Sequence, residues 1–139
     1  MKHLLFLLAF ISPLSFADNY SPQKVVYHVN YADHSRINAT IANIRNHLDA
    51  VGESNSDIKV VTHGPAIEYL QEAINNDDYQ IKLDELRFRG VQFVICGNTL
   101  SAYGLSGEQL YEVEDSDIVT AGLPEIVKLQ QAGYIYVRP

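Results

Sequence analysis

Short strand-like runs alternate with helical segments along most of this chain. Five runs rich in β-branched and apolar residues predict strands at 24–30, 58–62, 91–95, 117–120 and 134–137. The clearest apolar stripe at helical spacing between them consists of Ile37, Ile41, Ile44, Leu48 and Val51. Strands separated by helices favour right-handed βαβ crossovers. The sequence therefore predicts an α/β fold, with a mostly parallel sheet and helices on both of its faces.

Residues that cap and break helices give approximate bounds for the helical segments. Ser35 is expected to cap the first helix and Gly52 to end it. A second helix is expected at 65–74, a third at 81–89 after a polar break, and a last one from 122 to 133. The segment 97–113 gives no clear prediction, because Gly97, Gly104 and Gly107 would interrupt a helix there.

Residues 1–17 have the pattern of a secretory signal peptide. A basic start is followed by the apolar run 4–11, and small residues precede a cleavage site before Asp18. Eight apolar residues are too few to cross a hydrocarbon layer of about 30 Å, so we expect no membrane anchor. The mature chain, 18–139, contains no repeat or linker and is expected to be a single periplasmic domain.

Charge and motif content exclude several classes of function. The formal net charge is −7, and nucleic-acid binding calls for a basic face. The sequence has no glycine-rich phosphate loop, no P-loop lysine and no G-x-S-x-G elbow, so we expect no cofactor and no serine hydrolase. A single cysteine, Cys96, excludes a disulfide framework within one chain.

Residues able to do chemistry gather just after the predicted strands. The carboxyl ends of parallel strands meet at one edge of the sheet, where ligands usually bind. The candidates at this edge are Asn30, His34, His63, Gly64, Cys96, Gly97, Asn98 and Thr99. A helix beginning after Cys96 would lower the pKa of its thiol, and His63 could act as its base or cationic partner. Alternatively, Cys96 is an inert core residue and 63–65 is only a turn.

A metal site is a further alternative at the same edge. Its ligands would be drawn from His28, His34, His63 and Cys96, all of which suit zinc or copper. No pair of them has a spacing typical of metal ligands, and His28 lies in the middle of a strand, where core packing is more common. We therefore expect no metal.

Three segments resemble the DsrE/DsrF-like (YchN-like) family, and more narrowly its small exported branch. They are residues 59–65, 90–100 and 129–139, in that order along the chain. The resemblance implies a three-layer α/β/α domain on a five-stranded parallel sheet and assembly into homotrimers or homohexamers. It also implies a link to sulfur metabolism. In sulfur-relay members a cysteine accepts sulfane sulfur as a persulfide and passes it to a partner thiol, a role that would fall to Cys96.

Three hypotheses of function follow. In the first, Cys96 is a sulfur-handling or redox thiol that reacts with a thiol protein or a small sulfur compound. Residues 97–99 would then donate to its thiolate, while His63 and His34 assist proton transfer. In the second, the same edge is a non-catalytic binding module for a small ligand, a metal or a partner protein. In the third, Cys96 is buried at a subunit interface of a scaffold.

Overall fold

The computed structural model describes residues 20–139, so the predicted signal peptide lies outside the described residues. Five strands form one sheet: β1 (Gln23–Val29), β2 (Ser56–Thr62), β3 (Gln92–Cys96), β4 (Ile118–Val119) and β5 (Ile135–Val137). Every neighbouring pair is parallel, and the order across the sheet is β4-β3-β2-β1-β5. The predicted parallel α/β sheet is confirmed, although β4 is shorter than its predicted range.

Helices join the strands along the chain. They are α1 (His34–Val51), α2 (Ile67–Glu72), α3 (Asp77–Phe88), α4 (Gly97–Tyr103) and α5 (Gly122–Gln131). Short 3-10 turns lie at Glu53–Asn55, Gly64–Ala66, Ala73–Asn75, Gly107–Gln109 and Asp115–Asp117. The segment that gave no clear prediction begins as α4, which ends at Gly104 in the left-handed conformation.

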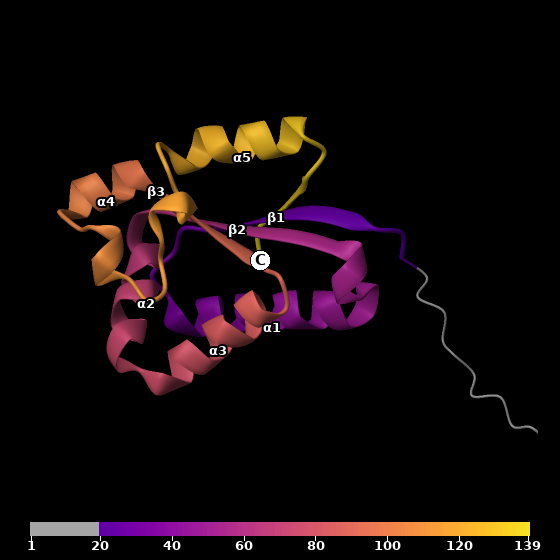
Figure 1. Ribbon diagram of the computed structural model, residues 1–139, viewed down its shortest axis with the longest axis horizontal. Coiled ribbons are helices and arrows are strands. Elements are labelled where there is room, and N and C mark those ends of the chain that lie inside the picture. The colour runs from indigo at the N-terminus through magenta and orange to yellow at the C-terminus, as the bar shows by residue number, and fades with distance from the viewer. Residues whose placement is uncertain (1–19) are drawn as a thin grey trace, which may run out of the picture.

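Strand order and crossover handedness decide which face each helix covers. The connections from β1 through β4 step in one direction, whereas the connection from β4 returns to β5 on the far side of β1. Because crossovers are right-handed, a helix that joins strands in one direction across the sheet packs on one face, and a helix that joins strands in the opposite direction packs on the other face. In Figure 1, α1 and α3 lie below the sheet and α5 lies above it, which gives the three layers, while α4 lies at the left, beyond the strand ends.

Two helix starts differ from the sequence prediction. Asp33, not Ser35, caps α1, because its carboxylate accepts hydrogen bonds from the backbone N–H groups of Ser35 and Arg36. The third helix begins at Asp77 rather than at 81, because the Asn76 side chain caps it by accepting from the backbone N–H of Tyr79. The predicted polar break is therefore the capped first turn of α3.

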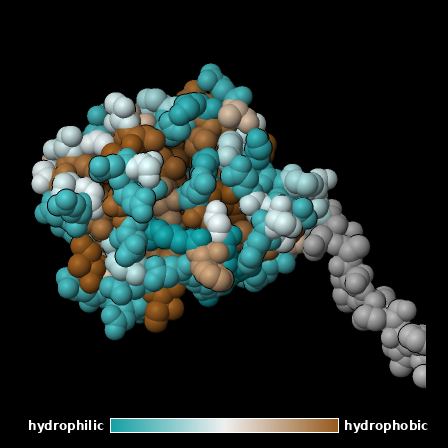
Figure 2. All heavy atoms as spheres, in the orientation of Figure 1, coloured by the Kyte–Doolittle hydropathy of each residue, from teal (hydrophilic) through white to brown (hydrophobic). Residues whose placement is uncertain are grey.

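The two faces of the sheet bury very different amounts of apolar surface. On the α1–α3 face, the cluster of buried apolar residues includes Ile44, Leu86 and Ile95 and reaches Leu100 of α4. On the opposite α5 face, the buried cluster consists of Val26, Val61, Ile126, Leu129 and Tyr134. Figure 2 shows apolar side chains reaching the surface in the upper part of the view, on the side of α5. The α5 face is therefore thin and partly open.

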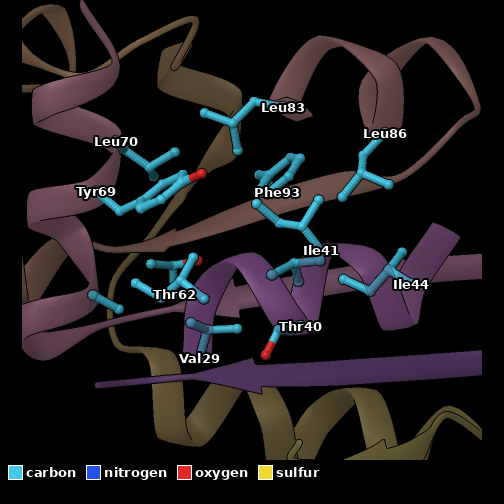
Figure 3. A pocket seen from close by; sticks show the side chains of 13 residues that line it. Val29, Thr40, Ile41, Ile44, Thr62, Tyr69, Leu70, Leu83, Leu86 and Phe93 are labelled. Atoms are coloured by element: carbon cyan, nitrogen blue, oxygen red, sulfur yellow. The ribbon is translucent and has the colours of Figure 1, made fainter. Parts of the chain in front are cut away.

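A small cavity lies inside the core of the α1–α3 face. Its volume is about 30 Å³, and Ile41, Leu83 and Phe93 are among the side chains that line it (Figure 3). That space admits little more than a water molecule. We therefore regard it as a packing gap rather than a ligand site.

Within residues 20–139, no helix is both long enough and apolar enough to cross a membrane.

Candidate functional site

A pocket opens between the carboxyl ends of β3 and β4. Helix α4, which follows β3, packs on the α1–α3 face, whereas α5, which follows β4, covers the opposite face. This divergence is the kind of switch point where open α/β sheets bind ligands. The pocket has a volume of about 480 Å³ and is lined by His63, Gly64, Cys96, Asn98, Thr99, Ala102, Tyr103, Ala121, Gly122, Leu123 and Pro124. Five of the eight predicted site residues thus line one pocket, and Gly97 adjoins it.

Cys96 is the last residue of β3 and lies at the wall of this pocket with 6% of its surface exposed. Burial raises the pKa of its thiol, but hydrogen bonds from the Thr99 hydroxyl and from nearby backbone N–H groups outweigh burial and lower the pKa overall. The N–H of Gly122 contributes most among the backbone groups, followed by those of Thr99 and Asn98. Cys96 therefore has an environment that favours the thiolate.

Thr99 connects the thiol to the end of β2. The Gly64 backbone N–H donates to Thr99 Oγ1 at 2.9 Å, which leaves the hydroxyl proton free to donate to the Cys96 sulfur. Gly64 has a φ of +59°, a left-handed conformation that glycine adopts without strain. The turn at 63–65 is thus part of the thiol site as well as a connection.

Two glycines allow the β3 and β4 ends to approach closely. A Cβ atom on Gly97 would lie 2.9 Å from the backbone oxygen of Val119. A Cβ atom on Gly122 would lie 3.3 Å from Cβ of Cys96 and 3.4 Å from Cβ of His63. The absence of a side chain at Gly122 therefore lets the first turn of α5 sit beside the thiol.

His63 lines the pocket, but its ring is bonded elsewhere. Its Nε2 lies 2.6 Å from Nε2 of His28, and Nδ1 of His28 lies 2.7 Å from the Tyr136 hydroxyl. Burial lowers the pKa values of both histidines. For His28 a charge on His63 and then the charge on Arg138 lower the pKa further, to about 4, and for His63 the charge on Arg138 does so. Both rings are therefore neutral near pH 7. Among the described residues, no hydrogen bond joins His63 to Cys96.

Two predicted site residues lie outside the pocket. The Asn30 side chain accepts a hydrogen bond from Arg138 at 2.7 Å. His34 begins α1, and its Nδ1 lies 3.1 Å from the Tyr79 hydroxyl, with Tyr69 packed against its ring. The structure thus brings His63 and residues 96–99 together and leaves Asn30 and His34 apart.

The considered metal ligands do not assemble into one centre. In the part of the chain that the structure describes, no three His, Cys, Asp or Glu side chains converge as metal ligands. The site instead includes two residues that the sequence did not single out, Gly122 and Tyr136. Gly122 lies at the end of the fourth predicted strand, but only the pairing of β3 with β4 brings it to Cys96. Nothing in the sequence pairs Tyr136 with His28.

The fold and sequence match known proteins. A family model for the DsrE/DsrF-like family matches residues 23–139. The solved structure of MTH1491, a protein of unknown function from Methanobacterium thermoautotrophicum, is 34% identical, with a TM-score of 0.74, over 84% of this chain and 99% of that chain.

The ychN protein of E. coli has the same coverage of both chains at 17% identity, with a TM-score of 0.65, and shares the fold. A search of curated proteins found no match. The family model covers nearly all of the described residues. The chain belongs to the DsrE/DsrF-like family.

Proposed function

We propose that this protein carries sulfane sulfur as a persulfide on Cys96. The observation that carries the proposal is the set of donors around the thiol: the Thr99 hydroxyl and three backbone N–H groups lower its pKa despite its burial. A thiolate is the nucleophile in sulfur transfer, and the same donors would stabilise Cys96 when it becomes the leaving group. Membership of the DsrE/DsrF-like family is consistent with this chemistry.

The proposed cycle has two displacements and no net oxidation. The Cys96 thiolate attacks the sulfane sulfur of a persulfide or thiosulfate donor. The donor's S–S bond breaks, and its electron pair leaves with the departing thiolate or sulfite. A partner thiolate then attacks the outer sulfur of the Cys96 persulfide. That second S–S bond breaks, and Cys96 recovers its electron pair as the thiolate that the surrounding donors stabilise.

Intact-mass analysis tests the proposal directly. Reduced protein incubated with inorganic polysulfide should gain the mass of one sulfur atom per chain, and a second incubation with a small thiol should remove it. The matched Cys96→Ser variant should gain nothing. An unmodified mass for the wild-type chain, together with alkylation of Cys96 no faster than that of a peptide thiol, would contradict a carrier role. That result would favour the binding-module hypothesis for the same pocket.

The proposal includes export to the periplasm, supported by the signal-peptide pattern at 1–17. When the full chain is expressed in a Gram-negative host, the protein in the periplasmic fraction should begin at Asp18. Recovery of the uncleaved chain in the cytoplasm alone would contradict export.

We also propose that the protein forms a homo-oligomer, a trimer or a hexamer. Helix α5 exposes the large apolar side chains of Leu123 and Val127 on its outer surface. Exposed apolar residues gathered on one side of a domain are typical of subunit interfaces. Light scattering after size exclusion tests the assembly, and a monomer at micromolar concentration would contradict it.

A further inference from the structure

A chain of polar side chains runs under α5 toward the Cys96 pocket. It begins at Tyr136 on the edge strand β5, passes through His28 on β1 and ends at His63 after β2. The two imidazole rings are nearly parallel, with centroids 4.8 Å apart and an angle of 21° between their planes. His28 is buried, with 6% of its surface exposed, whereas Tyr136 is 39% exposed and so reaches solvent.

Two neutral imidazoles in this contact allow only two arrangements of protons. In the first, the Tyr136 hydroxyl donates to Nδ1 of His28, Nε2–H of His28 donates to Nε2 of His63, and Nδ1 of His63 carries a proton. In the second, each of these bonds is reversed, and Nδ1 of His63 carries none. The heavy atoms keep the same positions in both arrangements. Reversing the chain therefore delivers or removes one proton at Nδ1 of His63.

His63 is placed to use that proton on a substrate of Cys96. It lines the same pocket as Cys96. The two residues flank Gly122, where an added Cβ atom would contact the Cβ atoms of both. Among the described residues, Nδ1 of His63 makes no hydrogen bond. Because Thr99 and the backbone N–H groups already stabilise the Cys96 thiolate, His63 is not required to deprotonate it.

We propose that Tyr136, His28 and His63 form a proton relay that protonates the sulfur leaving the donor and later deprotonates the thiol that accepts sulfur. This inference rests on the proposed carrier function and adds a role for residues beyond the thiol. His63 is the catalytic member, since it would meet the reacting sulfur. His28 and Tyr136 act through it and are positioning residues.

Each half of the cycle balances its proton. When the donor's S–S bond breaks, the leaving thiolate takes the proton from Nδ1 of His63, His63 receives one at Nε2 from His28, and His28 receives one from Tyr136. Solvent water restores the Tyr136 hydroxyl. When the acceptor thiol enters, its proton passes to Nδ1 of His63, and the chain reverses and returns one proton to solvent. The positive charge of Arg138 acts on both histidines and favours keeping them neutral throughout.

A pair of reagents that differ only in the leaving group tests the relay. Methyl methanethiosulfonate and dimethyl disulfide both place a methylthio group on Cys96. The first releases methanesulfinate, a weak base, whereas the second releases methanethiolate, a strong base that benefits from protonation. The variant Tyr136→Phe removes the outer end of the relay and keeps the ring. The matched control is Tyr20→Phe, at an exposed tyrosine that does not line the pocket.

We expect Tyr136→Phe to slow the reaction with dimethyl disulfide on the order of tenfold and to leave the reaction with methyl methanethiosulfonate unaffected. This loss is smaller than the roughly 10²–10⁴-fold typical of general acid catalysis, because the variant removes only the outer end of the relay. His63→Gln should show the same selectivity with a larger loss, and Tyr20→Phe should show none. An equal loss with both reagents, no loss with either, or a wild-type Cys96 inert to both would overturn the relay.

The two proposals can fail separately in this experiment. Selective loss with dimethyl disulfide, in a protein that gains no sulfur atom from polysulfide, would keep the relay as part of thiol–disulfide exchange and reject the carrier function. Persulfide formation without selective loss would reject the relay alone. Alkylation by iodoacetamide, which releases iodide and requires no proton for it, should be the same in wild type and Tyr136→Phe, and confirms that the variant retains the folded site.

Discussion

On the α1–α3 face of the sheet, α1, α2 and α3 cover a broad apolar core, whereas on the α5 face a single helix covers a small one. His28, Cys96 and Tyr136 project on the α5 face together with its small apolar cluster, and His63 follows at the end of β2. The thiol, the two bonded imidazoles and the exposed tyrosine therefore share the face with less apolar burial. The α1–α3 face, by contrast, holds mainly apolar side chains.

The difference follows from the strand order. Forward steps of the chain place successive helices on one face, and only the return from β4 to β5 places a helix on the other. The same return creates the divergence between α4 and α5 that opens the Cys96 pocket. A fold of this order thus separates a stabilising face from one where polar groups remain close to solvent, and substitutions on the two faces should have different consequences.

A matched pair of leucines gives the largest expected difference. Leu86 of α3 is fully buried in the α1–α3 face, and Leu129 of α5 lies in the small cluster of the α5 face. Leu86→Ala should lower the free energy of unfolding by about 2–5 kcal/mol, since it leaves a cavity in a tightly enclosed core. Leu129→Ala should cost less, because solvent and mobile surface side chains can fill the space. Urea unfolding measures both, and equal costs would remove the distinction between the faces.

Gly97 provides the next test, at the point where β3 and β4 converge. Gly97→Ala places a methyl group 2.9 Å from a backbone oxygen, which cannot rotate away. We expect a loss of about 1–3 kcal/mol in the free energy of unfolding, as for other overpacked sites. Gly122→Ala, whose nearest contacts are 3.3–3.5 Å away, should be milder in stability. If Gly97→Ala proved neutral, the close approach would not be needed to build the pocket.

Acid should destabilise the α5 face through His28. The pKa of His28 is about 4 in the folded protein, lowered first by burial, against an ordinary value of 6.5. As the pH falls, the unfolded chain therefore binds a proton first, so stability is complete above pH 6.5 and is lost between pH 6.5 and 4. We expect a loss of about 2–3 kcal/mol over this window, since each unit of difference in pKa between the folded and unfolded states corresponds to about 1.4 kcal/mol.

Unfolding midpoints measured across that window in wild type and in His28→Gln separate this contribution from that of the carboxylates. The variant should show a flatter dependence on pH. An unchanged slope would assign the acid sensitivity to other groups.

The fold was predictable because its signals are local. The apolar stripe of α1 and the β-branched runs of β1 and β2 are visible in the sequence, and the structure has a helix and two strands at these positions. Helix starts were less predictable, since both Asp33 and Ser35 can cap a helix, and only the folded chain shows which carboxylate or hydroxyl meets the free N–H groups. The segment after β3 gave no prediction because its glycines weaken a helix that tertiary contacts nonetheless stabilise.

The site was only partly predictable, because strand ends say which residues share an edge but not which are neighbours. Cys96 and Thr99 are close in sequence, and their proximity follows from the first turn of α4. The bond between His28 and His63, by contrast, depends on β1 pairing with β2 and on both side chains facing α5. Asn30 and His34 lie at the same edge of the sheet as Cys96, but they contact Arg138 and Tyr79 instead. The order of residues along the chain does not predict this difference.

Thr99→Val is expected to combine a small effect on stability with a clear effect on the chemistry of Cys96. Thr99→Val keeps the shape of the side chain and removes both the acceptor for the Gly64 N–H and the donor to Cys96. Stability should fall by about 1 kcal/mol, the usual net value of a neutral hydrogen bond. The pKa of Cys96 should rise, because the valine removes the hydroxyl group that donates to the thiolate.

The pH dependence of iodoacetamide alkylation measures that pKa, and Thr99→Ser is the matched control because it retains the hydroxyl. The serine variant should keep a low pKa and load sulfur from polysulfide at nearly the wild-type rate, whereas the valine variant should load it more slowly below its raised pKa. If both variants kept the wild-type pKa, the backbone N–H groups of Gly122 and Thr99 would suffice to stabilise the thiolate. The hydroxyl would then serve only to join the turn after β2 to α4, a structural role on the face that otherwise carries the chemistry.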